Sequence, residues 1–351
     1  MRFIRLLTKC WLLSILVLAS CEASAAILPP VSDNERCQYL GDPLNNASSD
    51  DFRLAFRVSD YFKANEDSLE RLVNEWNTSS CVFDDGSPVL RSLSIGYQMA
   101  LNAENRQESL IRVEYLKTKY PNTAFVALAE AIYWKEYAWL ARGHGFALSV
   151  DPVGWKLFNE RLEKAEKVLI DSKPYAAELP IWYVEMIQVQ SLLNRPVDDR
   201  TKIFLEGSNK HRSYYLIYFA MLNSISPKWG GSWEEVDNLV KSTVDKTQDV
   251  YGKAMYARLY MYINEELPRD EKLYKTTLAS WPDMKRSFED MMTQYPSSNL
   301  NLNKFAMFAC VAEDKETFLK LRRTIGKDKL RWVWPRNNSL ELCELKFGYV
   351  Q

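Results

Sequence analysis

Apolar residues recur along most of the chain with the spacing of an α-helix, and two-residue alternation is rare. The clearest stripe has apolar residues three or four positions apart, at Trp155, Phe158, Leu162, Ala165 and Leu169. This spacing places all of them on one helix face. Asp151 and Pro152 precede the stripe as a capping residue and a first-turn residue, so we predict that a helix begins here.

Three further stripes have the same period: Trp233, Val236, Leu239 and Val240; Met255, Leu259, Tyr262 and Ile263; and Met284, Phe288, Met291 and Tyr295. Ser232 and Glu235 form the pattern of a capping box at the start of the first of these. Each stripe predicts a short amphipathic helix. Since no such helix can bury its stripe alone, we expect the helices to pack against one another.

A faint internal repeat indicates how the helices are stacked. The segment 116–123 resembles the segment 291–298: in each, a helical pattern ends in Tyr-Pro and a small polar residue follows. Proline stops the first helix, and the polar residue is expected to cap the next. We therefore predict an all-α fold, a tetratricopeptide-like helix-pair solenoid (α-α superhelix), with an irregular helical bundle as the alternative. Glycine, at 12 of 351 residues, is too scarce for a typical β-sandwich or doubly wound sheet.

The N-terminus has the pattern of an export signal. Arg2, Arg5 and Lys9 precede a ten-residue apolar stretch at 10–19, which is too short to span a bilayer as a permanent helix. Leu18-Ala19-Ser20-Cys21 resembles the bacterial lipobox, in which the cysteine takes a diacylglycerol. We predict a lipoprotein signal peptide at 1–20, lipidation at Cys21, a flexible tether at 21–50 and a helical repeat domain at 51–345.

This pattern predicts a bacterial cell-envelope protein attached to a membrane through an N-terminal lipid. Glu22 follows the cysteine where an Asp favours inner-membrane retention in enteric bacteria, so we expect outer-membrane attachment facing the periplasm. The alternative is cleavage after Ala25, which leaves a soluble periplasmic or secreted protein.

Four cysteines remain apart from Cys10 and Cys21: Cys37, Cys81, Cys310 and Cys343. An even number in an oxidising compartment suggests disulfides. Three pairings are possible, and we favour Cys37–Cys81 and Cys310–Cys343 because each pair lies near one end of the chain. A buried free thiol at Cys310 is the alternative.

Charge and composition exclude some functions. Removal of the signal peptide leaves 42 basic and 46 acidic residues, a net charge of −4, without a basic stripe. Nucleic acid is therefore not an expected partner. His144 and His211 are the only histidines, and the cysteines lack metal-site spacing, so we expect no metal and no other cofactor.

Two glycine-containing loops are candidate binding loops. The first contains Arg142, Gly143, His144 and Gly145, which could offer an anionic contact, a titrating group and close backbone approach. The structural interpretation is favoured, in which Gly143 ends a helix and Arg142 compensates its dipole. The second contains Trp229, Gly230, Gly231 and Trp233, which form either an aromatic platform or, as we favour, a turn, a cap and an anchoring indole.

The sequences of the two loops, taken together, resemble those of a known group of proteins. The pattern A-R-G-x-G-aromatic-A, followed by Gly154-Trp155, and the later P-x-W-G-G-S-W resemble a bacterial family known only as a domain of unknown function. The resemblance covers residues 50–325. It implies an α-helical, tetratricopeptide-like protein, and it brings no established reaction. Many members have a small residue where this chain has His144.

The sequence favours a binding protein over an enzyme, since it contains no nucleophile elbow, zinc-protease, phosphate-loop or EF-hand motif. We expect a protein-binding module or scaffold in the cell envelope, with an unidentified protein partner on the concave face. One alternative is a periplasmic immunity protein against an interbacterial toxin. Another is an enzyme of unknown reaction around Arg142, His144, Asp151 and Trp229.

Overall fold

A computed structural model describes most of the chain. The described residues are 38–39, 42–43, 47–79, 81–101, 106–143, 145, 147–268, 271–334 and 339–349. The predicted signal peptide, the lipidation site Cys21, Cys37 and the loop residue His144 lie outside this part of the chain.

The described part is all-α, with one short strand pair before the first helix. The α-helices are α1 (Ala47–Ala64), α2 (Glu66–Thr78), α3 (Arg91–Ala100), α4 (Arg106–Lys119), α5 (Ala124–Arg142), α6 (Pro152–Ala176), α7 (Pro180–Leu192), α8 (Val197–Lys210), α9 (Leu216–Ser224), α10 (Trp233–Tyr251), α11 (Ala254–Glu266), α12 (Leu273–Thr276), α13 (Trp281–Gln294), α14 (Asn299–Val311), α15 (Lys315–Ile325) and α16 (Leu340–Phe347). Short 3-10 turns are η3 (Ala147–Ser149), η4 (Pro227–Trp229) and η5 (Arg331–Val333). Strands β1 (Gln38–Tyr39) and β2 (Asp42–Pro43) pair antiparallel, with Gln38 opposite Pro43.

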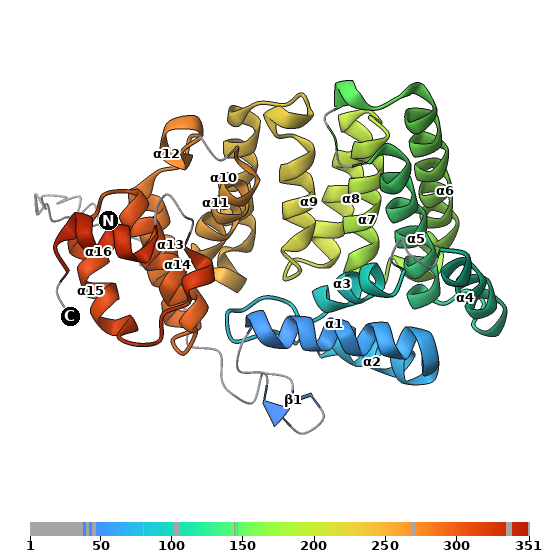
Figure 1. Cartoon of the computed structure of the whole chain (residues 1–351), viewed down its shortest axis with the longest axis horizontal. Coiled ribbons are helices and arrows are strands. Elements are labelled where there is room, and N and C mark those ends of the chain that lie inside the picture. The colour runs from blue at the N-terminus through green and yellow to red at the C-terminus, as the bar shows by residue number, and fades with distance from the viewer. Residues whose placement is uncertain are drawn as a thin grey trace, which may run out of the picture.

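From α5 onward, successive helices pack as neighbours and run side by side across the molecule (Figure 1). The contacts join α5 with α6, α7 with α8, α10 with α11, and α14 with α15. This packing of helix pairs is consistent with a helical repeat. The helices predicted from the stripes at 155–169, 233–240 and 284–295 correspond to α6, α10 and α13. Asp151 caps α6 by accepting from the Gly154 amide, and Ser232 caps α10 by accepting from the Glu235 amide.

The helices of the array are of two kinds. Helices α6, α10 and α13 each have a buried stripe and a solvated face, as predicted. Helices α7, α9, α11 and α14 are buried around most of their circumference; in α11, all residues from Ala254 to Met261 are buried. The prediction of an amphipathic helix for 255–263 was therefore wrong, because α11 has packed neighbours on more than one side.

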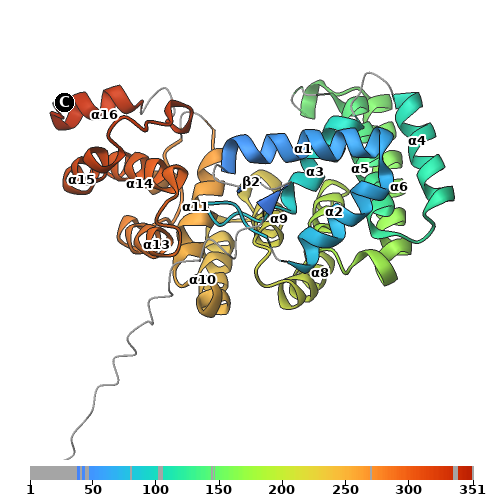
Figure 2. The same ribbon diagram turned by 90° about the horizontal axis from the view of Figure 1, so that it is seen from below.

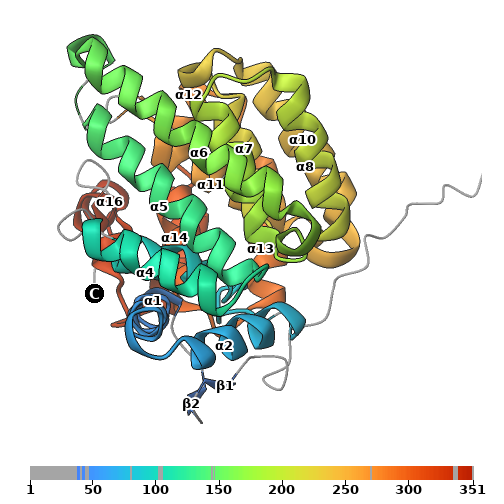
Figure 3. The ribbon, with the colours of Figure 1, turned by 90° about the vertical axis from the view of Figure 1, so that its right-hand side faces the viewer.

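The N-terminal helices lie along one side of this array (Figure 2 and Figure 3). Seen from below, α1 crosses the molecule from the neighbourhood of α11 to that of α4 (Figure 2). A view from the side places α1 and α2 along the lower edge, beneath α4 and α5 (Figure 3). Helix α3 contacts both α1 and α5. The chain's own first helices thus lie along one edge of the helix array and are joined to it through α3 (Figure 3).

Local details correct two other expectations. In the repeated Tyr-Pro turns, Ser298 caps α14 by accepting from the Asn301 amide, but Thr123 donates its hydroxyl to the Tyr120 carbonyl and makes no cap bond to α5. Helix α1 begins at Ala47, and β1 and β2 lie before it. The segment 21–50, predicted to be a flexible tether, therefore includes ordered backbone at its end.

A disulfide joins Cys310 in α14 to Cys343 in α16, as predicted, and its Cα atoms are 6.0 Å apart. Cys81 is also disulfide-bonded, and Cys37, its expected partner, lies outside the described residues. Disulfides are typical of an oxidising, extracytoplasmic compartment. Among the helices of the described part, none combines the length and apolarity needed to cross a membrane.

Candidate functional site

A tight hairpin loop, residues 81–89, packs against α11 and α14 of the helix array. Val82 and Pro88 form an antiparallel bridge, and the Phe83 amide donates to the Ser87 carbonyl over 2.8 Å. The turn between them is closed by the Gly86 amide, which donates to the Phe83 carbonyl. Asp84, Asp85 and Ser87 are all buried. Polar side chains at this depth require partners within the protein.

The partners of the hairpin come from the second half of the chain. The backbone carbonyl of Asp85 accepts from the guanidinium of Arg258 in α11, and from the amide of Asn301 in α14 over 3.2 Å. Gly86 has φ +80°, and a Cβ added there would lie 2.3 Å from the Tyr295 ring. The hairpin therefore connects α3 to α11 and α14, far along the sequence.

Charge is balanced around the Asp85 carboxylate. Its Oδ1 accepts from the Ser87 amide over 2.8 Å and from the Ser87 hydroxyl over 2.5 Å. Burial would raise the pKa of Asp85, but the charges of Arg91 and Arg258 and the bonds from Ser87 outweigh it, so its pKa lies below the usual value. Arg91 also pairs with the buried Asp51 of α1 over 2.7 Å. The carboxylate is held ionised in a structural network, where it cannot act as a general acid.

Aromatic rings enclose the two arginines. The Arg258 guanidinium lies 5.1 Å from the Tyr215 ring centroid and 5.7 Å from that of Tyr295. Burial raises the pKa of Tyr215 to about 12, so its hydroxyl stays protonated at neutral pH. The Nε atoms of Arg91 and Arg258 are buried without a hydrogen-bond partner. Charge, hydrogen bonds and stacking thus hold the hairpin against α11 and α14.

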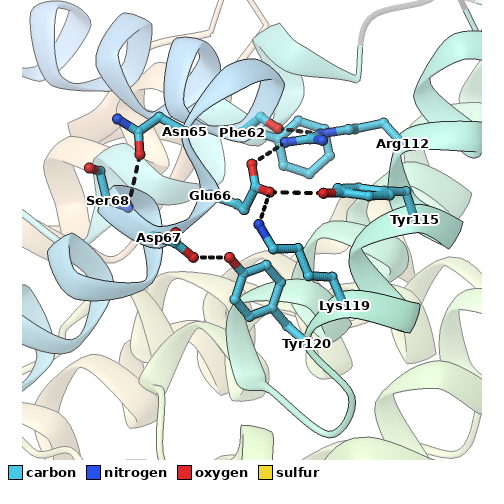
Figure 4. A network of polar contacts seen from close by, with 9 residues as sticks. All are labelled: Phe62, Asn65, Glu66, Asp67, Ser68, Arg112, Tyr115, Lys119 and Tyr120. Atoms are coloured by element: carbon cyan, nitrogen blue, oxygen red, sulfur yellow. Dashed lines mark hydrogen bonds and ion pairs between the residues drawn. The ribbon is translucent and has the colours of Figure 1, made fainter.

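A second polar network fastens the first helix pair to α4 (Figure 4). The Glu66 carboxylate, at the start of α2, accepts from Arg112 Nη2 over 2.7 Å, from Lys119 Nζ over 2.5 Å and from the Tyr115 hydroxyl over 3.2 Å. Beside it, the Tyr120 hydroxyl donates to Asp67. The hydrogen bond from Lys119, with further contributions from Arg112, lowers the pKa of Glu66 to about 2 although burial opposes this.

A polar cavity of about 210 Å³ lies further along α2, between this helix, the start of α5 and the α6–α7 corner. The cavity is lined by Glu70, Val73, Asn74, Asn77, Thr123, Ala124, Phe125, Tyr175, Glu178 and Leu179. Glu178 pairs with Lys210 over 2.6 Å, and Asn77 donates to the Glu178 carbonyl. Within the described residues, the Glu70 carboxylate has neither a hydrogen bond nor an ion pair. The cavity therefore offers one unpaired negative charge among amide and hydroxyl groups.

The first predicted loop has a local structural role in its described part. Gly143 ends α5 with φ +70°, and Arg142 Nη1 donates to the carbonyls of Gly143 and Gly145, each over 3.1 Å. The Arg142 guanidinium lies 5.2 Å from the ring centroids of both Trp139 and Trp155. These contacts fit the favoured interpretation as a helix end.

The second predicted loop also connects its own flanking helices. Trp229 donates its indole N–H to the Asn223 side chain of α9, which anchors the preceding helix rather than the following one. Gly230 is left-handed, and a Cβ at Gly231 would lie 1.9 Å from the Ile225 carbonyl oxygen. Trp233 packs against the core at the start of α10.

Sequence reasoning missed the hairpin cluster and the cavity. The segment 84–87 contains the aspartate, glycine and serine residues typical of a turn, but Arg258 and Asn301, the partners of Asp85, follow 173 and 216 positions later. Glu70 has no local signal at all. In the described part of the chain, no cluster of His, Cys, Asp and Glu could hold a metal ion. Comparison with known proteins finds no matching family model, curated protein or solved structure.

Proposed function

We propose that the protein is a lipid-anchored, tetratricopeptide-like helical-repeat module of the bacterial cell envelope that binds another protein. The packing of helix pairs, the Cys310–Cys343 disulfide and the lipobox-like Leu18–Cys21 support this proposal. We propose that the partner binds at the cavity between α2 and the α6–α7 corner, because the buried hairpin at 81–89 already has its partners in α11 and α14. The observation that carries the proposal is the unpaired Glu70 in this cavity.

The size and chemistry of the cavity favour a protein side chain as its occupant. At about 210 Å³ it is smaller than typical small-molecule pockets, which measure roughly 300–1,000 Å³. Glu178 is already neutralised by Lys210, so Glu70 leaves one negative charge to be matched. A lysine or arginine side chain of the partner would supply that charge, and Asn74 and Tyr175 would accept or donate further hydrogen bonds.

Photo-crosslinking in the native host tests this site. A photoreactive amino acid at Asn74, which is exposed at the rim, is expected to capture one partner in stoichiometric amount. Glu70→Lys should abolish capture, because it places a positive charge in the cavity that would repel the lysine or arginine side chain of the partner. Glu289→Lys, an exposed mid-helix glutamate on α13, is the matched control and should leave capture unchanged. Absence of a crosslink, or equal capture by the Glu70 variant, would contradict the site.

Anchoring is tested separately from partner binding. Mass spectrometry of the protein extracted from membranes should show a diacylglycerol-modified N-terminal cysteine at Cys21. Cys21→Ser should release the chain from the membrane fraction or leave it unprocessed. A native protein that starts at residue 26 and carries no lipid would instead support simple secretion.

A further inference from the structure

We propose that the outward face of α1 rests on an anionic lipid surface. This proposal deepens the proposed function and rests on its lipid anchor. Two large aromatic side chains on this helix are exposed one helical turn apart, Phe52 by 57 % and Phe56 by 60 %. Residues four positions apart share one helix face, so the two rings form a single apolar patch.

The same face carries basic residues around the two rings. Arg53 and Lys63 are exposed and Arg57 is half-buried, whereas Leu54, Ala55 and Val58 on the other side of α1 are fully buried. From Phe52 to Lys63 the sequence holds three basic residues and one acidic residue, Asp60. Phenylalanines between arginines and lysines are the pattern of helices that lie in the headgroup region of a bilayer. The buried side of α1 is meanwhile fixed to α3, so the outward face is presented on a rigid support.

The position of α1 in the chain favours lipid over a protein as the occupant. About 25 residues separate the predicted lipidation site Cys21 from the start of α1 at Ala47. Even fully extended, a chain of that length spans at most about 90 Å. It would hold α1 near the bilayer at high effective concentration. Helix α1 also lies along the lower side of the molecule in Figure 1, beside the labelled strand β1 through which the chain arrives.

Other exposed apolar residues of the molecule lack this combination of aromatic and basic neighbours. Leu345 in α16 is 79 % exposed, but it stands between acidic and basic residues at the far end of the chain. Ile170 in α6 is 55 % exposed beside Asp171. Neither has the pairing of two aromatic rings with a basic surround next to the tether.

Vesicle sedimentation tests the proposal on the mature chain from Glu22, exported behind an unrelated cleavable signal peptide so that no lipid is attached. The probes are vesicles of phosphatidylcholine alone and vesicles that also contain phosphatidylglycerol. We expect binding to the anionic vesicles, weaker binding at high salt, and little binding to phosphatidylcholine alone. The double variant Phe52→Asp/Phe56→Asp should lower the partition coefficient about tenfold or more. Leu345→Asp should change it by less than about twofold.

Thermal unfolding of each variant checks that these exposed substitutions leave the fold intact. The proposal is overturned if the mature chain does not bind anionic vesicles, if the double variant binds as well as the unaltered chain, or if Leu345→Asp weakens binding equally. Failure here is distinguishable from failure of the proposed function, since acylation of Cys21 and crosslinking at Asn74 are measured on the native protein and do not involve Phe52 or Phe56.

Discussion

At the scale of single residues, the closeness of neighbouring atoms explains why some positions require glycine. Gly86 and Gly230 both have positive φ, of 80° and 89°, yet only Gly86 is enclosed. A Cβ at Gly86 would meet the Tyr295 ring and the Arg258 guanidinium, whereas a Cβ at Gly230 would have no atom within 4 Å. Substitutions at the two glycines can therefore distinguish the energetic cost of backbone strain from that of close packing.

Alanine at these two positions gives a direct prediction. Gly86→Ala should lower the free energy of unfolding by about 2–4 kcal/mol, because it adds overpacking to the backbone strain. Gly230→Ala, the matched control, should cost only about 1 kcal/mol from strain. Urea denaturation of both variants measures the difference. Equal losses would mean that the hairpin does not need the contact with Tyr295 and Arg258.

The Glu66 carboxylate gives a prediction for pH. Since its pKa falls from 4.5 to about 2 in the folded protein, its contribution to stability is present above pH 4.5 and is lost as pH falls from about 4.5 towards 2. Glu66→Gln should destabilise the protein at neutral pH by about 1–2 kcal/mol and flatten this acid dependence. Glu70→Gln, one turn further along α2, is the control and should do neither. Thermal midpoints between pH 7 and pH 2 provide the test.

At the scale of elements, the cap residue Asp314 links two helices. Its Oδ1 accepts from the Thr317 amide at the start of α15, and its Oδ2 accepts from Trp281 and Lys285 of α13, each over 3.0 Å. Burial would raise the pKa of Asp314, but these bonds and those from Thr317 hold it well below its usual value. By contrast, the Ser232 side chain accepts only from Glu235 of its own helix α10.

The two caps should therefore differ in strength. Asp314→Ala is expected to cost about 2–3 kcal/mol, because it removes a cap and leaves partly buried donors unpaired. Ser232→Ala should cost about 1 kcal/mol, the usual value for a single cap. Chemical denaturation of the two variants compares them. If Ser232→Ala costs as much as Asp314→Ala, the link to α13 contributes nothing.

Several helix starts and buried helix faces could be predicted from the sequence, because they depend on residues that are close together along the chain. Asp151 and Ser232 mark the starts of α6 and α10 within four residues of the amides that they cap, and the stripe at 155–169 needs only its own helix. The covering of α11 was not predictable, since a helix that is apolar on all sides does not reveal which neighbours bury it. The contacts of the hairpin at 81–89 could not be predicted either, because the partners of Asp85 lie in helices more than 170 positions away.

At the scale of the whole molecule, the C-terminal end is fastened by a covalent bond. The disulfide between Cys310 and Cys343 closes a loop of 33 residues and holds α16 against α14. Arg322 of α15 adds a buried ion pair to Glu344 over 2.5 Å. Helix α16 has only eight residues and buries few side chains, Leu340, Cys343 and Phe347.

Removal of this bond should loosen the end of the array. The double variant Cys310→Ser/Cys343→Ser is expected to lose about 3 kcal/mol of stability. Hydrogen exchange should show the loss first in α16, which has too little buried surface to stay folded alone. Unchanged exchange in α16 would show that the ion pair to Glu344 and the packing of Phe347 suffice.

The hairpin at 81–89 also has a consequence for biosynthesis. The Asp85 carbonyl accepts hydrogen bonds from Arg258 and Asn301, so the contacts of the N-terminal hairpin can be completed only after α14 has been synthesised. Ordinary arrays of repeats can grow or shrink by whole units, because each unit touches only its neighbours. This chain closes upon itself instead. A shortened version that ends after α11 would expose the apolar surface of α11 that packs against α13, so the length of the chain can change only outside the segment from the hairpin to α14.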